Sequence, residues 1–168
     1  LVVSEICIGY ESRRQFMKPP KVAKARAGRP SPRLAPGLVT HIERSAIDLD
    51  LARSQWQGYV DALRSQGWET IEVDPAPDCP DSVFIEDAVV VYGRTAVVTR
   101  PGADERKPET EAAERAVTAL GYDVKRIEAP GTLDGGDVLK YGGRVWVGQG
   151  GRTNEEGLRQ LREHLAPE

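Results

Sequence analysis

Val83–Tyr92 reads VFIEDAVVVY, and the architecture of the chain can be worked out from this run of β-forming residues. It is followed by Gly93-Arg94 and by a second such run, Thr95–Arg100, TAVVTR. Two β-type runs around a two-residue turn that contains Gly predict a β-hairpin. Glu86 and Asp87 interrupt the first run. Because successive strand side chains point to opposite faces, at least one of these carboxylates is expected to face inward, where it needs a cation or donors.

The residues after this hairpin predict a helix and then another strand. Pro108 suits the first turn of a helix, and Gly121 ends it. The apolar positions between them recur at helical spacing and are Ala112, Ala116, Val117 and Leu120. Val124–Ile127 is the next β-type run. One unit of the chain therefore reads strand, strand, helix, strand.

The same order of elements then starts again. Val138–Tyr141 and Arg144–Gly148 predict a second hairpin around Gly142-Gly143. Thr153 and Glu156 have the spacing of a capping box, which predicts a helix through Leu165. A repeated β-β-α-β unit indicates an α+β fold of modules placed side by side, each burying its sheet face against a neighbour.

The residues before Val83 predict one more helix and strand. Asp48 suits the N-cap of a helix and Gly67 its C-terminal stop. Trp68–Val73 follows as a strand, and Asp74–Pro80 as a Pro-rich loop. The hairpin expected before the Asp48 helix is only partly present. We expect about two and a half to three modules, which give a marginal core.

Composition narrows the class of protein. The 168 residues are mixed apolar and charged, as in a soluble globular domain. No stretch is apolar enough to span a membrane, and a cytoplasmic location is the expectation. Cys7 and Cys79 do not suggest a disulfide framework. Together with His41 and His164 they show no metal-ligand spacing, so no metal or other cofactor is expected.

Charge is spread unevenly along the chain. Residues 1–33 hold eight Lys and Arg against two Glu, whereas the remainder is acidic. A basic arm is a feature of nucleic-acid binders, but an acidic remainder argues against a phosphate-backbone partner. Residues 1–28 are therefore interpreted as a basic leader, disordered or misassigned, ahead of a domain over residues 29–168.

Several charged residues lie where helices and strands do not need them. Asp134 and Asp137 flank Gly135-Gly136, and Arg106 and Arg152 lie in loops before helices. Carboxylates bind a guanidinium in planar fashion, and arginines bind a carboxylate in the same way. The set therefore fits recognition of an arginine-like ligand. Each member also has an ordinary alternative: an edge-strand charge, a turn residue or a surface arginine.

Six separate motifs follow one another along the chain, and they are Arg29–Leu34, Gly37–His41, Pro80–Asp87, Thr99–Ala103, Leu133–Leu139 and Gly148–Asn154. Any one of them alone is weak evidence. Together, in order and spacing, they resemble the dimethylarginine dimethylaminohydrolase family, and the resemblance runs from Arg29 to the last residue.

The resemblance implies a fold and a reaction. The family has the pentein fold, an α/β propeller of five β-β-α-β modules with the substrate in the central channel. Its members hydrolyse N-methylated arginine to citrulline and methylamine or dimethylamine, without a cofactor. A cysteine attacks the guanidinium carbon, and a histidine handles the protons. The resemblance implies a dimethylargininase of arginine metabolism and nitric oxide regulation, with a small-molecule substrate and no nucleic-acid or membrane partner.

Site residues follow from the same resemblance, motif by motif. Leu38 belongs to the loop that covers the substrate, Asp81 contacts its amino-acid end and Phe84 lines the pocket. Glu86 and Asp87 lie in the substrate site, with Asp87 a ligand of the guanidinium. The remaining residues are Arg106 and Arg152, which bind or shape the pocket around the α-carboxylate, and Asp134, which orients the catalytic histidine.

The chain also departs from the family pattern. The family's catalytic histidine and cysteine belong to later modules; His164 does not match that histidine, and Cys79 matches a non-catalytic position. The chain is therefore expected to be an N-terminal fragment, inactive alone and poorly stable. Two alternatives stay open. One is an arginine deiminase or amidinotransferase relative, and the other is a non-catalytic module that binds arginine-like ligands or assembles with a partner chain.

Overall fold

The computed structural model describes residues 2–6, 24–37, 43 and 45–166. Leu38, His41 and Cys7 lie outside the described residues. The chain divides into two compact units. One comprises residues 13–85, and the other comprises residues 1–12 with residues 86–168. Each unit is described by itself.

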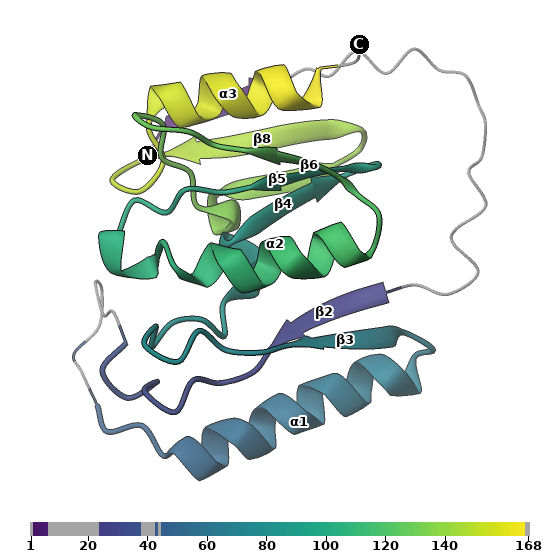
Figure 1. Ribbon diagram of the computed structural model, residues 1–168, viewed down its shortest axis with the longest axis vertical. Coiled ribbons are helices and arrows are strands. Elements are labelled where there is room, and N and C mark those ends of the chain that lie inside the picture. Colours follow the sequence, from purple (N-terminus) through teal and green to yellow (C-terminus); the bar gives the residue numbers. More distant parts are fainter. Residues whose placement is uncertain (1, 7–23, 38–42, 44, 167–168) are drawn as a thin grey trace. The chain divides into compact units, whose positions relative to one another are not determined.

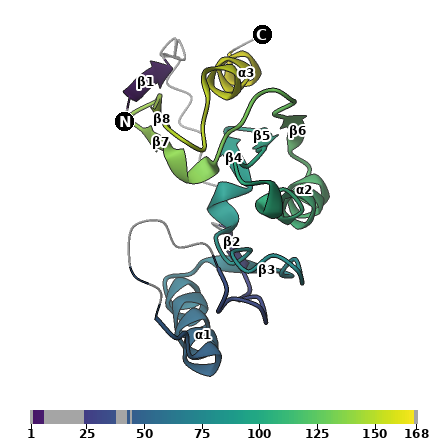
Figure 2. The ribbon, with the colours of Figure 1, turned by 90° about the vertical axis from the view of Figure 1, so that its left-hand side faces the viewer.

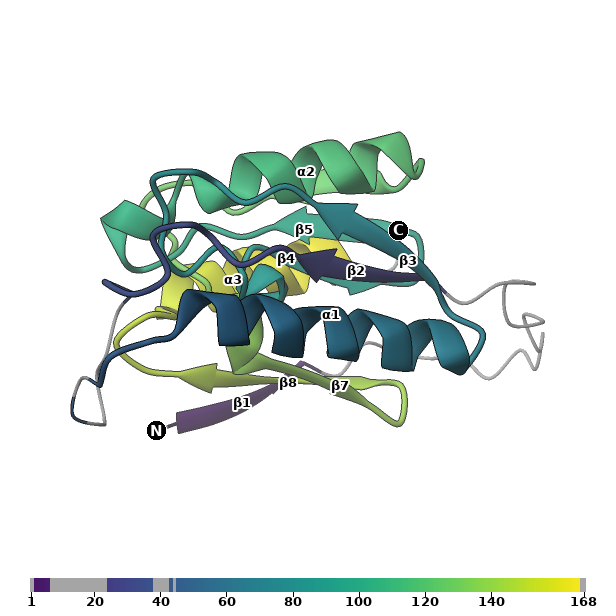
Figure 3. The same ribbon diagram turned by 90° about the horizontal axis from the view of Figure 1, so that it is seen from below.

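The unit of residues 13–85 is a strand-helix-strand arrangement. Strand β2 (Lys24–Gly28) pairs in parallel with β3 (Glu69–Val73), and helix α1 (Leu49–Ser65) lies in the connection (Figures 1 and 3). The Asp48 side chain accepts hydrogen bonds from the backbone N–H groups of Asp50 and Leu51, as expected of an N-cap. Gly67 has a φ of 82° and ends the helix, as predicted. α1 packs on β3 with Val60 fully buried.

The other unit contains the predicted β-β-α-β module. Strands β4 (Val89–Tyr92) and β5 (Thr95–Val98) form an antiparallel hairpin, α2 (Glu109–Ala119) follows, and β6 (Asp123–Arg126) returns parallel to β5. The sheet order is β4-β5-β6. α2 packs against this sheet (Figure 2). The predicted order of strand, strand, helix and strand is confirmed.

A second hairpin and helix complete this unit. Strands β7 (Val138–Tyr141) and β8 (Arg144–Gln149) pair around Gly142 and Gly143, whose φ values of 60° and 76° suit a hairpin turn that needs glycine. Helix α3 (Glu155–Leu165) packs against β8 and β5. The core between these elements consists of Val90, Val97, Ile127, Leu133, Val145, Val147, Leu158, Leu161 and Leu165.

Strands also occur in the segment interpreted as a leader. β1 (Val2–Ile6) pairs antiparallel with β8, giving the order β1-β8-β7, and β2 adds to β3. The structure thus describes two strands within residues 1–28, and the interpretation of this segment as a leader stays a prediction. Both strands are only five residues long and pair with strands far along the chain, so their own sequence gives little indication of them.

Two local predictions were wrong in detail. The strand expected from Val83 begins only at Val89, and Ile85–Asp87 forms a short 3-10 turn, η1. The N-cap of α3 is Asn154, whose side chain accepts from the Gly157 N–H, rather than Thr153. Both departures move an acidic or hydroxyl side chain into a polar cluster instead of leaving it in regular structure.

Candidate functional site

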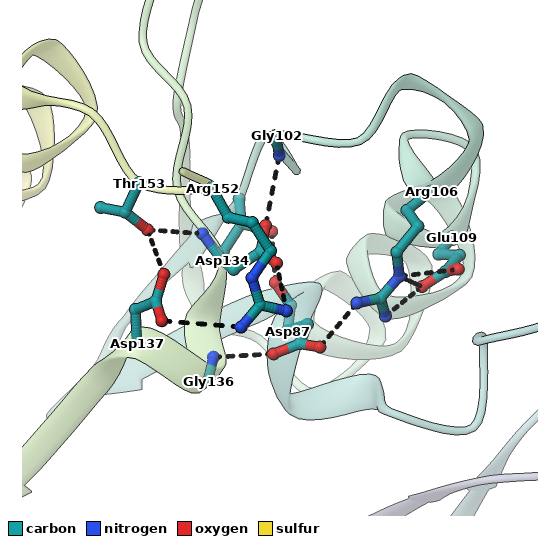
Figure 4. A network of polar contacts seen from close by, with 10 residues as sticks. Asp87, Gly102, Arg106, Glu109, Asp134, Gly136, Asp137, Arg152 and Thr153 are labelled. Carbon is teal, nitrogen blue, oxygen red and sulfur yellow. Dashed lines mark hydrogen bonds and ion pairs between the residues drawn. The ribbon is translucent and has the colours of Figure 1, made fainter. Parts of the chain in front are cut away.

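Four segments of the unit of residues 86–168 bring their polar side chains together (Figure 4). They are the end of η1 (Glu86 and Asp87), the stretch from Gly102 through the turn η2 (Asp104–Arg106) to the start of α2, Asp134 with the turn η3 (Gly135–Asp137), and the loop before α3. We call the set the polar network. Its members are Asp87, Gly102, Arg106, Glu109, Asp134, Gly136, Asp137, Arg152 and Thr153.

Arg106 is a buried cation held between two carboxylates. Only 5% of the residue is exposed. Its Nη2 donates to Glu109 Oε2 at 2.7 Å, and its Nε lies 3.1 Å from both oxygens of the same carboxylate. Its Nη1 donates to Asp87 Oδ2 at 2.7 Å. Burial lowers the pKa of Arg106, but the hydrogen bonds and charges of Glu109 and Asp87 outweigh burial, so the pKa is raised and the charge is permanent.

Asp87 is oriented by both ends of its carboxylate. Oδ1 accepts from the Gly136 N–H at 2.9 Å, and Oδ2 accepts from Arg106. The Asp87 backbone carbonyl accepts from the Thr99 hydroxyl at 2.6 Å. A Cβ on Gly136 would lie 2.4 Å from Asp87 Oδ1, so any larger residue here would push the carboxylate out of this position. The inward carboxylate expected of the Glu86-Asp87 pair is thus Asp87, supplied with a cation and a donor.

Asp134 is the most deeply buried carboxylate of the network, with 1% of the residue exposed. Its Oδ1 accepts from the Gly102 N–H at 3.3 Å, and its Oδ2 lies 3.2 Å from Arg152 Nη1. Burial raises the pKa of Asp134, and the nearby charge of Asp87 adds to this. The Gly102 hydrogen bond and the charges of Arg152 and Arg106 oppose burial, but the net pKa stays above its ordinary value.

Asp134→Asn is expected to change how stability depends on pH. A carboxyl whose pKa is higher in the folded state holds its proton more tightly there, so ionisation destabilises the fold. The resulting loss of folding free energy begins as the pH rises past the ordinary pKa of about 4, and it is complete above the folded-state pKa. The variant lacks the loss, so its free energy of unfolding relative to the natural chain should rise from acid to neutral pH in urea titrations.

Glu156→Gln provides a control of opposite sign. Hydrogen bonds from Arg159 and Gln160 lower the pKa of Glu156 to about 2. Its contribution to stability is fully present above its ordinary pKa and is lost progressively as the pH falls from that value to the folded-state pKa of about 2. The stability of Glu156→Gln relative to the natural chain should therefore fall from acid to neutral pH. Parallel pH curves for the natural chain and Asp134→Asn would contradict the assignment.

Arg152 bridges two carboxylates from the more exposed side of the network. Its Nη1 lies near Asp134, and its Nη2 lies 3.8 Å from Asp137 Oδ1, while 54% of its side chain is exposed. Thr153 ties the two aspartates together: its hydroxyl accepts from the Asp134 N–H at 3.2 Å and donates to Asp137 Oδ2 at 2.6 Å. Arg152 is thus the accessible cation of the network, and Arg106 is the buried one.

The remaining predicted site residues are placed as follows. Glu86 is exposed and belongs to the same unit as the network. Asp81 and Phe84 belong to the unit of residues 13–85, where Asp81 is buried and Phe84 is 47% exposed. Leu38 is outside the described residues. The structure therefore brings together Asp87, Arg106, Asp134 and Arg152.

Three residues that contribute side chains to the network were not predicted as site residues. Glu109 was missed, although Arg106 and Glu109 have the i,i+3 spacing of a helix pair and so carry a recognisable signal. Asp137 was counted among the charged residues of the Asp-Gly-Gly-Asp turn but was given no role of its own, and Thr153 was interpreted as a helix cap. Within the part of the chain that the structure describes, no group of three or more His, Cys, Asp and Glu could hold a metal ion. Nor is any described helix long and apolar enough to cross a membrane.

Known proteins with similar sequences include dimethylarginine dimethylaminohydrolases of three bacteria. The chain is 60% identical over 144 residues to N(G),N(G)-dimethylarginine dimethylaminohydrolase of Streptomyces coelicolor, covering 86% of this chain and 56% of that protein. No model of a protein family matches the chain. The chain thus spans about half the length of the curated relatives it matches.

Solved structures agree. The Pseudomonas aeruginosa dimethylarginine dimethylaminohydrolase, as a cysteine-to-serine variant complexed with citrulline, matches with a TM-score of 0.79 and 37% identity. The match covers 86% of this chain and 56% of that one. The N-terminal domain of a cyanobacterial arginine dihydrolase matches with a TM-score of 0.73 at 19% identity, which shows the fold alone; that match covers 84% of this chain and 54% of that one.

Proposed function

We propose, from the premise that this chain is a homologue of the dimethylarginine dimethylaminohydrolases with the pentein fold, that it supplies substrate recognition in such an enzyme. The proposed reaction is hydrolysis of N-methylated arginine to citrulline and methylamine or dimethylamine. The observation that carries the proposal is that Asp87 and Asp134 each already hold a guanidinium, from Arg106 and Arg152. Their carboxylates are therefore oriented for planar cations of the substrate's kind.

The proposed roles follow the position of each side chain. Asp87 binds the substrate guanidinium, and Glu86, its neighbour in sequence, also belongs to the substrate site. Arg152, the accessible cation, binds the α-carboxylate, whereas buried Arg106 shapes the pocket by holding Asp87. Asp134, buried and close to a cation, suits orienting a protonated histidine. The other proposed substrate residues are Asp81 for the amino-acid end, Phe84 for the apolar stem and Leu38 for the covering loop.

The nucleophile of the reaction is not assigned to a residue of this chain. The family's chemistry needs a cysteine thiolate that reaches the guanidinium carbon. Cys79 is 2% exposed, and Asp78 and Asp81 close to it in sequence disfavour a thiolate. We therefore give Cys79 no catalytic role. We also propose that the reaction needs no cofactor. With this substrate the enzyme acts in arginine metabolism and nitric oxide regulation, in the cytoplasm.

Two other functions use the same network. An arginine deiminase or amidinotransferase also binds a guanidinium, and a fold match to an arginine dihydrolase keeps this candidate open. The much higher identity to dimethylarginine dimethylaminohydrolases favours the methylated substrate. Citrulline release from methylated arginine, but not from arginine, by the complete gene product separates these reactions. A non-catalytic binding module predicts binding of citrulline and no release in either case.

Asp87→Asn tests ligand recognition directly. The amide has no charge for a guanidinium, so the affinity of the chain for N-methyl-L-arginine is expected to fall about 100-fold in calorimetric titration. Asp78→Asn is the control, because its side chain is 91% exposed and lies outside the network. Near-ultraviolet circular dichroism reports whether Asp87→Asn stays folded. Equal affinities of the natural chain and the Asp87→Asn variant would overturn the role of Asp87.

A further inference from the structure

Glu109 is a buried carboxylate in an unusual place. It is the first residue of α2, where acidic side chains ordinarily lie in solvent beside the N–H groups of the first turn. Here only 4% of its side chain is exposed, and it is directed at the Nε–Nη2 edge of Arg106 (Figure 4). Burying this carboxylate is costly without a cation, so its position is tied to that of Arg106.

Glu109 determines which part of Arg106 reaches Asp87. The Nε–Nη2 edge of a guanidinium is one of those that form two parallel hydrogen bonds with a carboxylate. Glu109 occupies that edge, and Nη1 is the nitrogen directed at Asp87 Oδ2. Without the Glu109 carboxylate, the Nε–Nη2 edge of Arg106 loses the partner that keeps it turned away from Asp87.

Glu109 also changes the charge of the site. Asp87 and Arg106 alone form a neutral pair, which has little attraction for a second guanidinium. Glu109 adds a negative charge, so the three side chains together carry one net negative charge. In a site this buried, a net charge acts on a ligand with little screening by solvent.

We propose that Glu109 is a positioning residue for the guanidinium site: it neutralises and fixes Arg106, so that Asp87 keeps its charge for a cationic ligand. This inference rests on the proposed function, because it takes the ligand to be a guanidinium. It predicts that Glu109 selects for the charge of the ligand without touching it. The neutral product citrulline is held with little help from Glu109, and the cationic substrate needs it.

The test compares two ligands and two variants of the full 168-residue chain. Glu109→Gln keeps the size of the side chain and removes the charge, and Glu111→Gln removes a charge from the same helix turn at an exposed position. In calorimetric titration, Glu109→Gln is expected to weaken N-methyl-L-arginine about tenfold relative to citrulline. Glu111→Gln should leave the ratio of the two dissociation constants unchanged. An unchanged ratio in Glu109→Gln overturns the proposal.

A second measurement needs no ligand. The Nε–H proton of Arg106, held by Glu109, should exchange slowly with water in NMR spectra of the natural chain and of Glu111→Gln, and rapidly in Glu109→Gln. Slow exchange in Glu109→Gln overturns the positioning. If the natural chain binds neither ligand, the proposed function fails, while this comparison still decides whether Glu109 holds Arg106.

The conservative variant Glu109→Asp tests whether the effect of Glu109→Gln comes from the lost charge or from a general loss of structure. It keeps the charge and shortens the side chain by one methylene. The ratio of the two dissociation constants should return towards the natural value, because the net charge is restored. The Arg106 Nε–H proton should still exchange faster than in the natural chain, because the shorter carboxylate reaches the guanidinium less well. If N-methyl-L-arginine binds Glu109→Asp as weakly, relative to citrulline, as it binds Glu109→Gln, the charge argument is contradicted.

Discussion

Arg106→Met is expected to lower the free energy of unfolding by about 4 kcal/mol, the cost of leaving buried charges without their partner. Arg106 lies between Asp87 and Glu109, whose side chains are 12% and 4% exposed. Methionine fills much of the same volume but donates no hydrogen bond. Two carboxylates are then left facing each other in a site shielded from water, and both Coulomb repulsion and lost hydrogen bonds oppose folding. Urea unfolding at neutral pH measures the difference.

A matched variant shows how much of the stability cost of Arg106→Met comes from the burial of the network and how much from losing any arginine. Arg115 pairs with Glu111 on the exposed side of the same helix, so Arg115→Met should cost less than about 0.5 kcal/mol. The double variant Arg106→Met with Glu109→Gln removes one of the two stranded charges. It should be more stable than Arg106→Met alone, because the network is coupled. A cost for Arg106→Met no larger than that for Arg115→Met would refute the buried-network interpretation.

The elements that sequence predicts well in this chain are those with local causes. Asp48 and Gly67 end α1 through hydrogen bonds and a positive φ within a few residues. The two hairpins follow from paired β-type runs around turns that contain glycine. From these elements the repeated module could be recognised, because each depends on residues that are close in sequence.

The errors fall where a distant residue competes for a side chain. The run Val83-Phe84-Ile85 has the composition of a strand, but no strand forms there, and η1 from Ile85 places Asp87 between Arg106 and Gly136. Thr153 has the spacing of an N-cap, yet its hydroxyl bonds the Asp134 N–H and Asp137 instead, and Asn154 caps α3. No pattern near Thr153 contains that information, because its partners lie 16 and 19 residues away.

The candidate site shows the same division. Unneeded charges at Asp87, Asp134, Arg106 and Arg152 pointed to a polar cluster, and the structure places these four side chains in one network. The sequence did not reveal that the two arginines differ in burial and in the carboxylates they pair with. Arg106 is buried against Glu109, whereas Arg152 stays half exposed. Burial of a single side chain depends on the packing of four segments, which local composition does not determine.

Gly135→Ala is expected to lower the free energy of unfolding by about 3 kcal/mol, the upper range for forcing a group into a packed interior. A Cβ at this position would lie 2.0 Å from the Glu86 backbone carbonyl oxygen. The contact is with backbone, so no side-chain rotation relieves it. Because Gly136 follows directly and donates to Asp87, any shift of η3 away from η1 also lengthens that hydrogen bond. Glycine in the Asp-Gly-Gly-Asp motif thus allows η3 to approach η1, and this constrains the motif more strongly than the formation of a turn does.

Gly151→Ala is the control for this prediction. A Cβ on Gly151 would meet no atom within 4 Å, although the residue lies next to Arg152 of the same network. Its cost should be below about 0.5 kcal/mol, as for an ordinary surface substitution. Urea unfolding compares the two, and titration with N-methyl-L-arginine should show weaker binding in Gly135→Ala alone, because only there is the carboxylate of Asp87 released from Gly136. Equal stabilities of the two alanine variants would show that η1 and η3 do not approach as closely as this packing requires.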